Sequence, residues 1–204
     1  MTPLQPLGSD VGHADQLLTM SAKEFVAWDL KQKIRHEFVR GEVFAMAGAE
    51  ERHIIAAMNI GMALRNHLRG TPCNTLMNEM KVRVEAADCY FYPDVVVTCS
   101  ASDNDALVKS EPMLVVEVLS PGTAAYDRGD KFADYRLLPS LQEYLLVDTA
   151  KRRCDLFRKL NDGLWVLHPF DHHQAVVLAS VDLTLAPDAL WERLPPAGST
   201  QTLP

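Results

Sequence analysis

Two acidic residues lie inside neighbouring apolar segments of this chain. Asp94 interrupts YFYPDVVVTC, and Glu117 interrupts PMLVVEVL. Strand interiors disfavour acidic residues, and a buried carboxylate is costly unless it is paired or binds a metal. If the segments 90–98 and 113–119 pair as antiparallel strands, with facing residue numbers that sum to about 211, Asp94 lies directly opposite Glu117.

Facing carboxylates with Cβ atoms about 4.5–5.5 Å apart repel each other, and a divalent cation between them removes that repulsion. Oxygen ligands of this kind suit Mg²⁺ or Mn²⁺. A purely structural alternative exists, because Asp94 follows Pro93 and Glu117 precedes Ser120-Pro121, so both acids could simply mark strand ends. Spacing alone leaves both interpretations open.

Two lysines are candidates for the positive charge that such a site needs. Asp127, Lys131 and Tyr135 follow one another at intervals of four, so on the next helix they share a face. That face either directs Lys131 toward the two carboxylates or carries only an Asp127–Lys131 surface ion pair. Lys81 lies beside the strand aspartate if the chain turns back at 86–89 with a register sum of about 175.

Other polar residues have both a functional and a structural interpretation. His53, at the start of a helix, is a site residue or packs at the helix terminus. Glu37 and Glu42 lie on either side of a turn. They serve as an extra metal ligand or a hydrogen-bond acceptor, or they belong to a solvated hairpin. The segments HPFDHH and KRR (151–153) lack a metal-binding motif, so we interpret them as solvated loops.

The elements that must position these residues follow from periodicity and from turn residues. A short helix at 21–33 has Ser21 as its N-cap and Glu24 three residues later, and a hairpin turns at Arg40-Gly41. The remaining expected elements are a helix at 50–70, strands at 76–85, 90–98 and 113–119, a helix at 124–138, a strand at 142–148, and antiparallel strands at 154–160, 164–170 and 175–181.

Length and composition indicate one medium-sized globular domain of 204 residues. We expect a flexible arm at 1–18, a single domain at 19–190 and a flexible tail at 191–204. The net charge of -7 argues against a protein that coats nucleic acid non-specifically. We expect no membrane contact and a cytoplasmic location, because apolar runs are short. No two cysteines form a C-x-x-C pair, so we expect free thiols at Cys73, Cys89, Cys99 and Cys154.

At these residues the chain resembles the PD-(D/E)XK nuclease superfamily and, more closely, the Uma-type family of restriction endonucleases. The matching segments cover roughly residues 20–170 and are HEFVRGEVFAMAG, ERH, YPDVVV, VVEVLSPGT and YDRGDKFADYRLLPSLQEYLLVD. The resemblance implies an α/β (α+β) fold with a restriction-endonuclease-like core. That core is a mixed sheet in the order helix–three strands–helix–strand, here with an extra N-terminal hairpin and C-terminal antiparallel strands.

The resemblance also implies metal-dependent endonuclease activity on nucleic-acid phosphodiesters, with DNA as the expected substrate. Asp94, Glu117 and the backbone carbonyl of Val118 would hold Mg²⁺ or Mn²⁺. The superfamily's usual lysine position is Leu119 here, so Lys131 becomes the expected catalytic lysine.

Cleavage of both strands of a duplex needs two active sites, so we expect a homodimer. The alternative is a catalytically inactive nuclease-like module that binds nucleic acid or a protein partner. Residues expected to support the site or contact the substrate are Glu42, His53, Lys81, Arg128 and Tyr135.

Overall fold

The computed structural model describes residues 18–46 and 48–195. The expected N-terminal arm, apart from residue 18, and the tail from 196 onward lie outside the described residues. Trp191 and Leu194 are buried in the hydrophobic core, so the expected tail boundary at 191 is wrong. Both side chains are large and apolar, and they belong to the same buried cluster as the inner face of the helix at 51–67. No helix among the described residues is long and apolar enough to cross a membrane.

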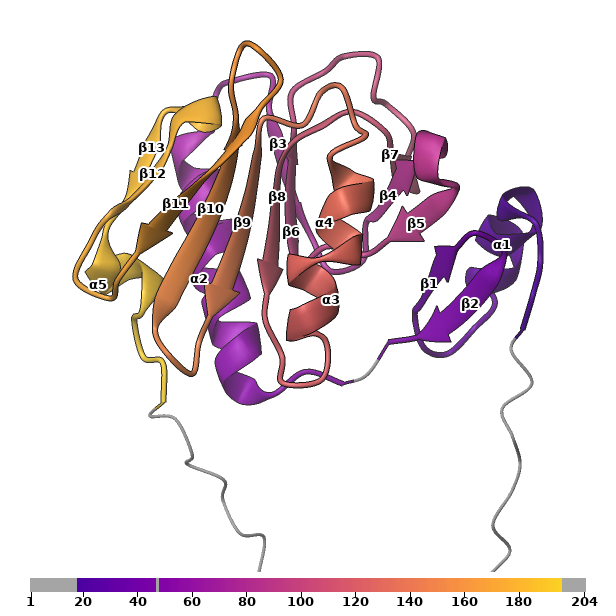
Figure 1. Ribbon diagram of the computed structural model, residues 1–204, viewed down its shortest axis with the longest axis horizontal. Coiled ribbons are helices and arrows are strands. Elements are labelled where there is room, and N and C mark those ends of the chain that lie inside the picture. Colours follow the sequence, from indigo (N-terminus) through magenta and orange to yellow (C-terminus); the bar gives the residue numbers. More distant parts are fainter. Residues whose placement is uncertain (1–17, 47, 196–204) are drawn as a thin grey trace, which may run out of the picture.

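A six-stranded mixed sheet, the main sheet, forms the centre of the molecule (Figure 1). Its order is β11-β10-β9-β8-β6-β3, and every neighbouring pair is antiparallel except β8 and β9. The strands are β3 (Asn74–Met77), β6 (Val95–Thr98), β8 (Pro112–Val118), β9 (Glu143–Asp148), β10 (Arg153–Lys159) and β11 (Trp165–Phe170).

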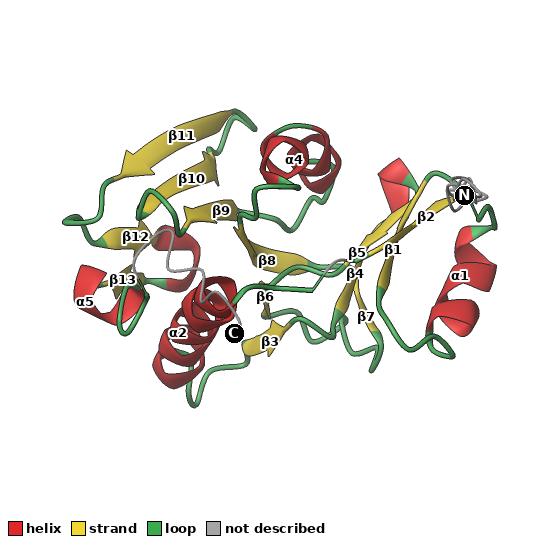
Figure 2. Cartoon of the chain, turned by 90° about the horizontal axis from the view of Figure 1, so that it is seen from below, coloured by secondary structure: helices red, strands yellow, loops and turns green. Residues whose placement is uncertain are grey.

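Helices cover both faces of the main sheet, as Figure 2 shows for α2 on one side and α4 on the other. The helix α2 (Glu51–His67) packs with β12 (Val176–Leu178), β13 (Leu183–Leu185) and α5 (Pro187–Leu190) over one core. The short helices α3 (Ala124–Arg128) and α4 (Asp130–Tyr135) pack over the other core. The order α2, β3, β6, β8, α3–α4, β9 is the expected helix–three strands–helix–strand core.

A second sheet, the small sheet, lies at one end of the molecule beside α1 (Ala22–Asp29) (Figure 2). Ser21 and Glu24 form the expected capping box at the start of α1. Arg40 and Gly41 both have positive φ, which a two-residue hairpin turn of this type requires. The strand order is β2-β1-β5-β4-β7, and the strands are β1 (His36–Val39), β2 (Glu42–Ala45), β4 (Lys81–Val84), β5 (Cys89–Phe91) and β7 (Val108–Lys109).

Two of the expected strands are each divided between the two sheets. The segment 76–85 breaks where Asn78 adopts a φ of 44°, so β3 joins the main sheet and β4 joins the small sheet. The segment 90–98 breaks at Pro93, which cannot donate a ladder hydrogen bond, so β5 and β6 also separate. Within the small sheet Val82 faces Phe91. The facing residue numbers therefore sum to 173, whereas the expected sum is about 175.

The expected helix at 124–138 is likewise two short helices. Gly129, with φ -111° and ψ -97°, stands between α3 and α4 outside helical geometry. The spacing of Asp127 and Lys131 survives this break, because their charged atoms lie 3.7 Å apart.

The expectation of four free thiols is wrong for two of them. Cys73 and Cys99 form a disulfide. The strand pairing explains this, because Asn74 faces Thr98 in the β3–β6 ladder and the cysteines occupy the next positions outward. Two cysteines separated by 26 positions in the sequence therefore meet across a ladder. Cys89 and Cys154 are free and buried, as expected.

Candidate active site

The register of the main sheet brings Asp94 and Glu117 to facing positions. Val95 faces Val116 in the antiparallel β6–β8 pair, so the next position outward sets Asp94 against Glu117, as expected. Asp94 Oδ2 accepts a hydrogen bond of 2.7 Å from the backbone N–H of Val118. The glutamate is only 5% exposed. The two acids therefore lie together where two interior strands of the sheet end, on the face that α3 and α4 cover.

Lys131 extends from α4 into a group of carboxylates. Its Nζ lies 2.8 Å from Glu37 Oε1, 3.0 Å from Glu117 Oε1 and 3.7 Å from Asp127 Oδ1. The lysine is 5% exposed, and its ammonium also lies 5.4 Å from the centre of the Phe91 ring. This arrangement is a buried cluster of three carboxylates around one ammonium, and the contact with Glu117 supports Lys131 as the lysine of the site.

Two aromatic or imidazole side chains complete the cluster. The Tyr135 hydroxyl donates to Glu117 Oε1 at 3.3 Å. His53, on the first turn of α2, places Nε2 2.8 Å from Asp94 Oδ1. The helix covering one sheet face and the helix covering the other therefore both contact the acidic pair.

Glu37 belongs to this cluster, whereas Glu42 does not. Glu37 lies on β1, and its Oε1 accepts the backbone N–H of Tyr92 at 3.3 Å in addition to its contact with Lys131. Glu42 is exposed on β2, opposite Val39. Glu42 therefore does not support the cluster, and its other expected role, a contact with substrate, stays a prediction. Asp127, which was expected only as a partner of the lysine, is a member of the cluster.

Lys81 and Arg128 have other partners. Lys81 Nζ lies 3.3 Å from Asp29 Oδ2, because β4 belongs to the small sheet, and the expected place beside Asp94 is wrong. Arg128 pairs with Asp155 on β10 and lies 4.0 Å from Asp148, so it is engaged in a surface ion-pair network.

Burial dominates the electrostatics of the cluster. It raises the pKa of Glu117 well above the usual range, Lys131 opposes that rise, and the negative charges of Asp94 and Asp127 add to it. Burial also raises the pKa of Asp127. For Lys131 burial acts to lower the pKa, but the facing carboxylates of Glu117 and Glu37 outweigh it and hold the pKa well above the usual range. The ammonium therefore stays charged at neutral pH.

The pKa of His53 is raised as well. Burial acts to lower it, but the hydrogen bond and the negative charge of Asp94 prevail. Burial and the charge of Glu117 raise the pKa of the Tyr135 hydroxyl, which therefore remains a hydrogen-bond donor. Because their pKa values are raised, His53 and Tyr135 keep the protons that they present to the carboxylates of Asp94 and Glu117.

The donor set suits a hard divalent cation. Four carboxylates (Glu37, Asp94, Glu117 and Asp127) face one ammonium and one imidazole, so negative charge is in excess even when His53 is protonated. Among the described residues, no three His, Cys, Asp or Glu side chains are already arranged to hold an ion. Asp94 and Glu117, the acids of the expected metal site, lie together here, and the expected ligand set with the Val118 carbonyl stays a prediction.

Comparison with known proteins identifies relatives along most of the chain. A family model named Uma2, described as "Putative restriction endonuclease", matches residues 22–189. An uncharacterised protein of Synechocystis sp., slr1290, is 35% identical over 176 residues, which are 86% of this chain and 93% of that protein. A second one from the same organism, sll1609, is 31% identical over 151 residues, covering 72% of this chain and 85% of that protein.

A solved structure from Anabaena variabilis, described as "a putative nuclease belonging to DUF820", superposes with a TM-score of 0.70. It covers 84% of this chain and 97% of its own, at 15% sequence identity. At that identity the likeness shows the fold, and it confirms the restriction-endonuclease-like architecture expected from the sequence.

Proposed function

Since this chain belongs to the Uma2 family, we propose that it is a metal-dependent endonuclease that hydrolyses phosphodiester bonds of DNA. The observation that carries the proposal is the contact between Lys131 and Glu117 at 3.0 Å, beside an aspartate that faces Glu117 across two paired strands. Two acids and a lysine from consecutive core elements are the parts that this chemistry needs.

Asp94 and Glu117, with the backbone carbonyl of Val118, are the proposed ligands for Mg²⁺ or Mn²⁺. When bound, such an ion neutralises non-bridging phosphate oxygens and lowers the pKa of a water molecule. His53 and the Val118 N–H hold the two oxygens of Asp94. Because both contacts fix the carboxylate in one orientation, His53 acts as a positioning residue in this proposal.

Lys131 supplies positive charge and hydrogen-bond donors at the reacting phosphate. A general base must lose its proton near the working pH, whereas the pKa of Lys131 is raised well above its usual range. Its proposed role is therefore to orient the attacking water and to offset charge that develops on the phosphate. Glu37 and Asp127 hold the ammonium in place and keep it protonated.

We further propose a homodimer and a cytoplasmic location. The described residues of one chain hold one such cluster, and cleavage of both strands needs two. The edge strand β11 exposes Val166 and Leu167, which supports the C-terminal strands as the contact between copies. The Cys73–Cys99 disulfide is unusual for a reducing compartment, and its redox state in cells tests the proposed location.

Plasmid cleavage with Mn²⁺ tests the proposed activity. We expect Asp94→Asn to lower the cleavage rate by about a hundredfold or more and to weaken Mn²⁺ binding in calorimetry. The matched control is Glu111→Gln, an exposed acid just before β8, which is expected to leave both unchanged. Mn²⁺ binding without any cleavage of DNA or RNA by the unaltered protein would instead favour a non-catalytic nuclease-like module.

A further inference from the structure

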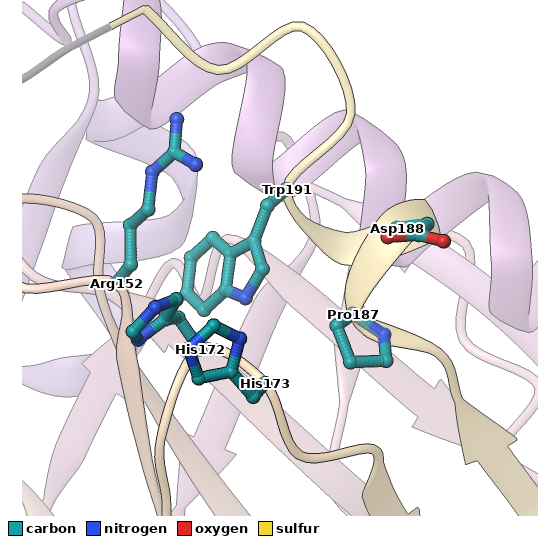
Figure 3. A pocket seen from close by; sticks show the side chains of 6 residues that line it. All are labelled: Arg152, His172, His173, Pro187, Asp188 and Trp191. Atoms are coloured by element: carbon teal, nitrogen blue, oxygen red, sulfur yellow. The ribbon is translucent and has the colours of Figure 1, made fainter.

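A pocket that is separate from the carboxylate cluster lies beside the turn between β9 and β10. Figure 3 shows the Trp191 ring between Arg152 and Pro187, with two imidazoles next to it. The turn, residues 149–152, supplies one wall, and the loop after β11 and helix α5 supply the others. The lining residues are Arg152, His172, His173, Pro187, Asp188 and Trp191.

The indole of Trp191 presents a donor without a partner. The residue is 9% exposed, and its Nε1 has no hydrogen-bond partner among residues 18–46 and 48–195. An indole N–H can only donate, and a buried donor that is left unpaired costs free energy. Nε1 itself is shielded from solvent, so the ring lines the pocket and this atom senses a ligand there without a direct contact in the present arrangement.

Arg152 brings a positive charge that no carboxylate in the described part of the chain neutralises by an ion pair. Its Nη2 donates to the backbone carbonyl of Leu194 at 2.9 Å. The neighbours in the turn differ, since Lys151 pairs with Asp148 and Arg153 pairs with Asp155. The unneutralised charge of this turn therefore lies at the pocket.

Two histidines lie near the base of the Arg152 side chain, whose guanidinium extends away from the imidazole rings in Figure 3. Their ring centroids lie 3.6 Å apart, and both residues are exposed. A protonated imidazole donates from both nitrogens, so an anion beside the pair gains hydrogen bonds. The one acid of the pocket, Asp188, is exposed, and Figure 3 shows its carboxylate pointing away from the imidazoles. The donor set therefore favours an anion that carries several oxygens.

We infer that this pocket binds a phosphate group, and that the group belongs to the backbone of the nucleic acid held at the carboxylate cluster. The assignment of this phosphate group to a nucleic acid rests on the proposed function. Arginine and histidine donors around a recess, with an aromatic ring as one wall, suit a phosphodiester and the sugar attached to it.

Contacts link the pocket to the candidate active site. Arg52 on α2 donates to the carbonyl of Thr149, in the same turn as Arg152, and the residue after Arg52 is His53, which contacts Asp94. Figure 1 shows the start of α2, the end of β8 and the β9–β10 turn along the same lower edge of the molecule. A strand bound at Asp94 and running along this edge reaches the pocket, where a phosphate contact fixes its register without reading its bases.

Nuclear magnetic resonance provides the test, since the indole N–H of Trp191 gives its own signal. Inorganic phosphate, titrated into the metal-free protein at constant ionic strength against chloride, is expected to move that signal along a saturable curve. Arg152→Gln should weaken the apparent affinity by about tenfold or more, as for the loss of a charge-assisted hydrogen bond. Lys151→Gln removes the same charge one position away and should change the affinity by about twofold or less.

His173→Asn is the second variant, because this exposed residue can change without disturbing the fold. It should also weaken phosphate binding, while Lys151→Gln does not. An indole signal that does not respond to phosphate, or equal affinities in Arg152→Gln and Lys151→Gln, would overturn the phosphate site.

A duplex without terminal phosphates, added in the presence of EDTA, distinguishes backbone phosphate from free phosphate. We expect it to move the same indole signal and to compete with inorganic phosphate. A response to free phosphate but not to the duplex would overturn the assignment to nucleic acid. These binding measurements do not depend on cleavage, so they stand apart from the failure or success of the proposed nuclease activity.

Discussion

Lys131→Met is expected to destabilise the metal-free protein strongly. The change keeps an apolar stem beside Phe91 but removes the ammonium that Glu37, Glu117 and Asp127 surround. Removing one partner of a buried ion pair costs about 3–5 kcal/mol, because the remaining charge is left buried and unpaired. At about 2–4 °C per kcal/mol for a chain of this size, the melting temperature should fall by roughly 6–20 °C.

The loss must depend on pH, and its sign follows from the raised pKa of Glu117. A carboxylate whose pKa is raised in the folded state binds its proton more tightly there, so its contribution to stability is present below its unfolded pKa, about 4.3, and is lost as pH rises. Lys131 opposes this rise in the pKa of Glu117. In Lys131→Met the pKa of Glu117 should therefore rise further, and the stability of the variant should fall more steeply with rising pH than that of the parent. The gap between variant and parent should therefore be larger at about pH 8 than at about pH 5.

Thermal unfolding in EDTA at both pH values measures this gap, with Lys151→Met as the control. Lys151 is an exposed lysine whose Nζ lies 3.5 Å from Asp148, and its loss should shift the melting temperature by about 1–2 °C or less. Equal melting temperatures for Lys131→Met and the parent, or a gap that does not change with pH, would refute the reasoning about the buried cluster.

Three further outcomes are expected. Mn²⁺ binding should tighten as pH rises and should release protons, because burial raises the pKa of Glu117. Calorimetry in buffers of different ionisation enthalpy measures the number of protons released. Binding without proton release at about pH 6 would contradict this expectation. Glu37→Gln should lower cleavage about tenfold or more, since it loosens the lysine, whereas Glu42→Gln on the next strand should stay within about twofold; equal effects would exclude a role for Glu37. Replacing Cys73 and Cys99 by serine should lower stability by about 2–4 kcal/mol, and an unchanged midpoint in urea would argue against the disulfide.

The sequence allowed the central geometry to be predicted because it depends on local rules. Pairing of 90–98 with 113–119 around a loop centred near residue 105 or 106 sets Asp94 opposite Glu117, and the β6–β8 ladder has that register. The spacing of Lys131 from Asp127 predicted a shared face but left its direction open, and the 3.0 Å contact with Glu117 decides it. Membership of the family, expected from the ordered motifs, is confirmed by a match over residues 22–189.

The errors arise where contacts between distant segments decide the structure. The sequence left Glu37 between a site role and a solvated hairpin, because it reaches the cluster only through the pairing of β1 with β5, where Phe38 faces Tyr90. Lys81 was misplaced because a break at Asn78 moves β4 to a different sheet. The disulfide was missed because its cysteines meet only through the β3–β6 register.

Anomalous diffraction from crystals soaked in Mn²⁺ tests the central claim most directly. The account predicts a manganese peak in contact with the carboxylates of Asp94 and Glu117 and with the Val118 carbonyl, and no such peak in crystals of Glu117→Ala. The Lys131 ammonium should remain within hydrogen-bonding distance of Glu37 when the ion is bound. No peak at the two carboxylates, or a peak only elsewhere, such as between His172 and His173, would contradict the claim that this acidic pair is a catalytic metal site.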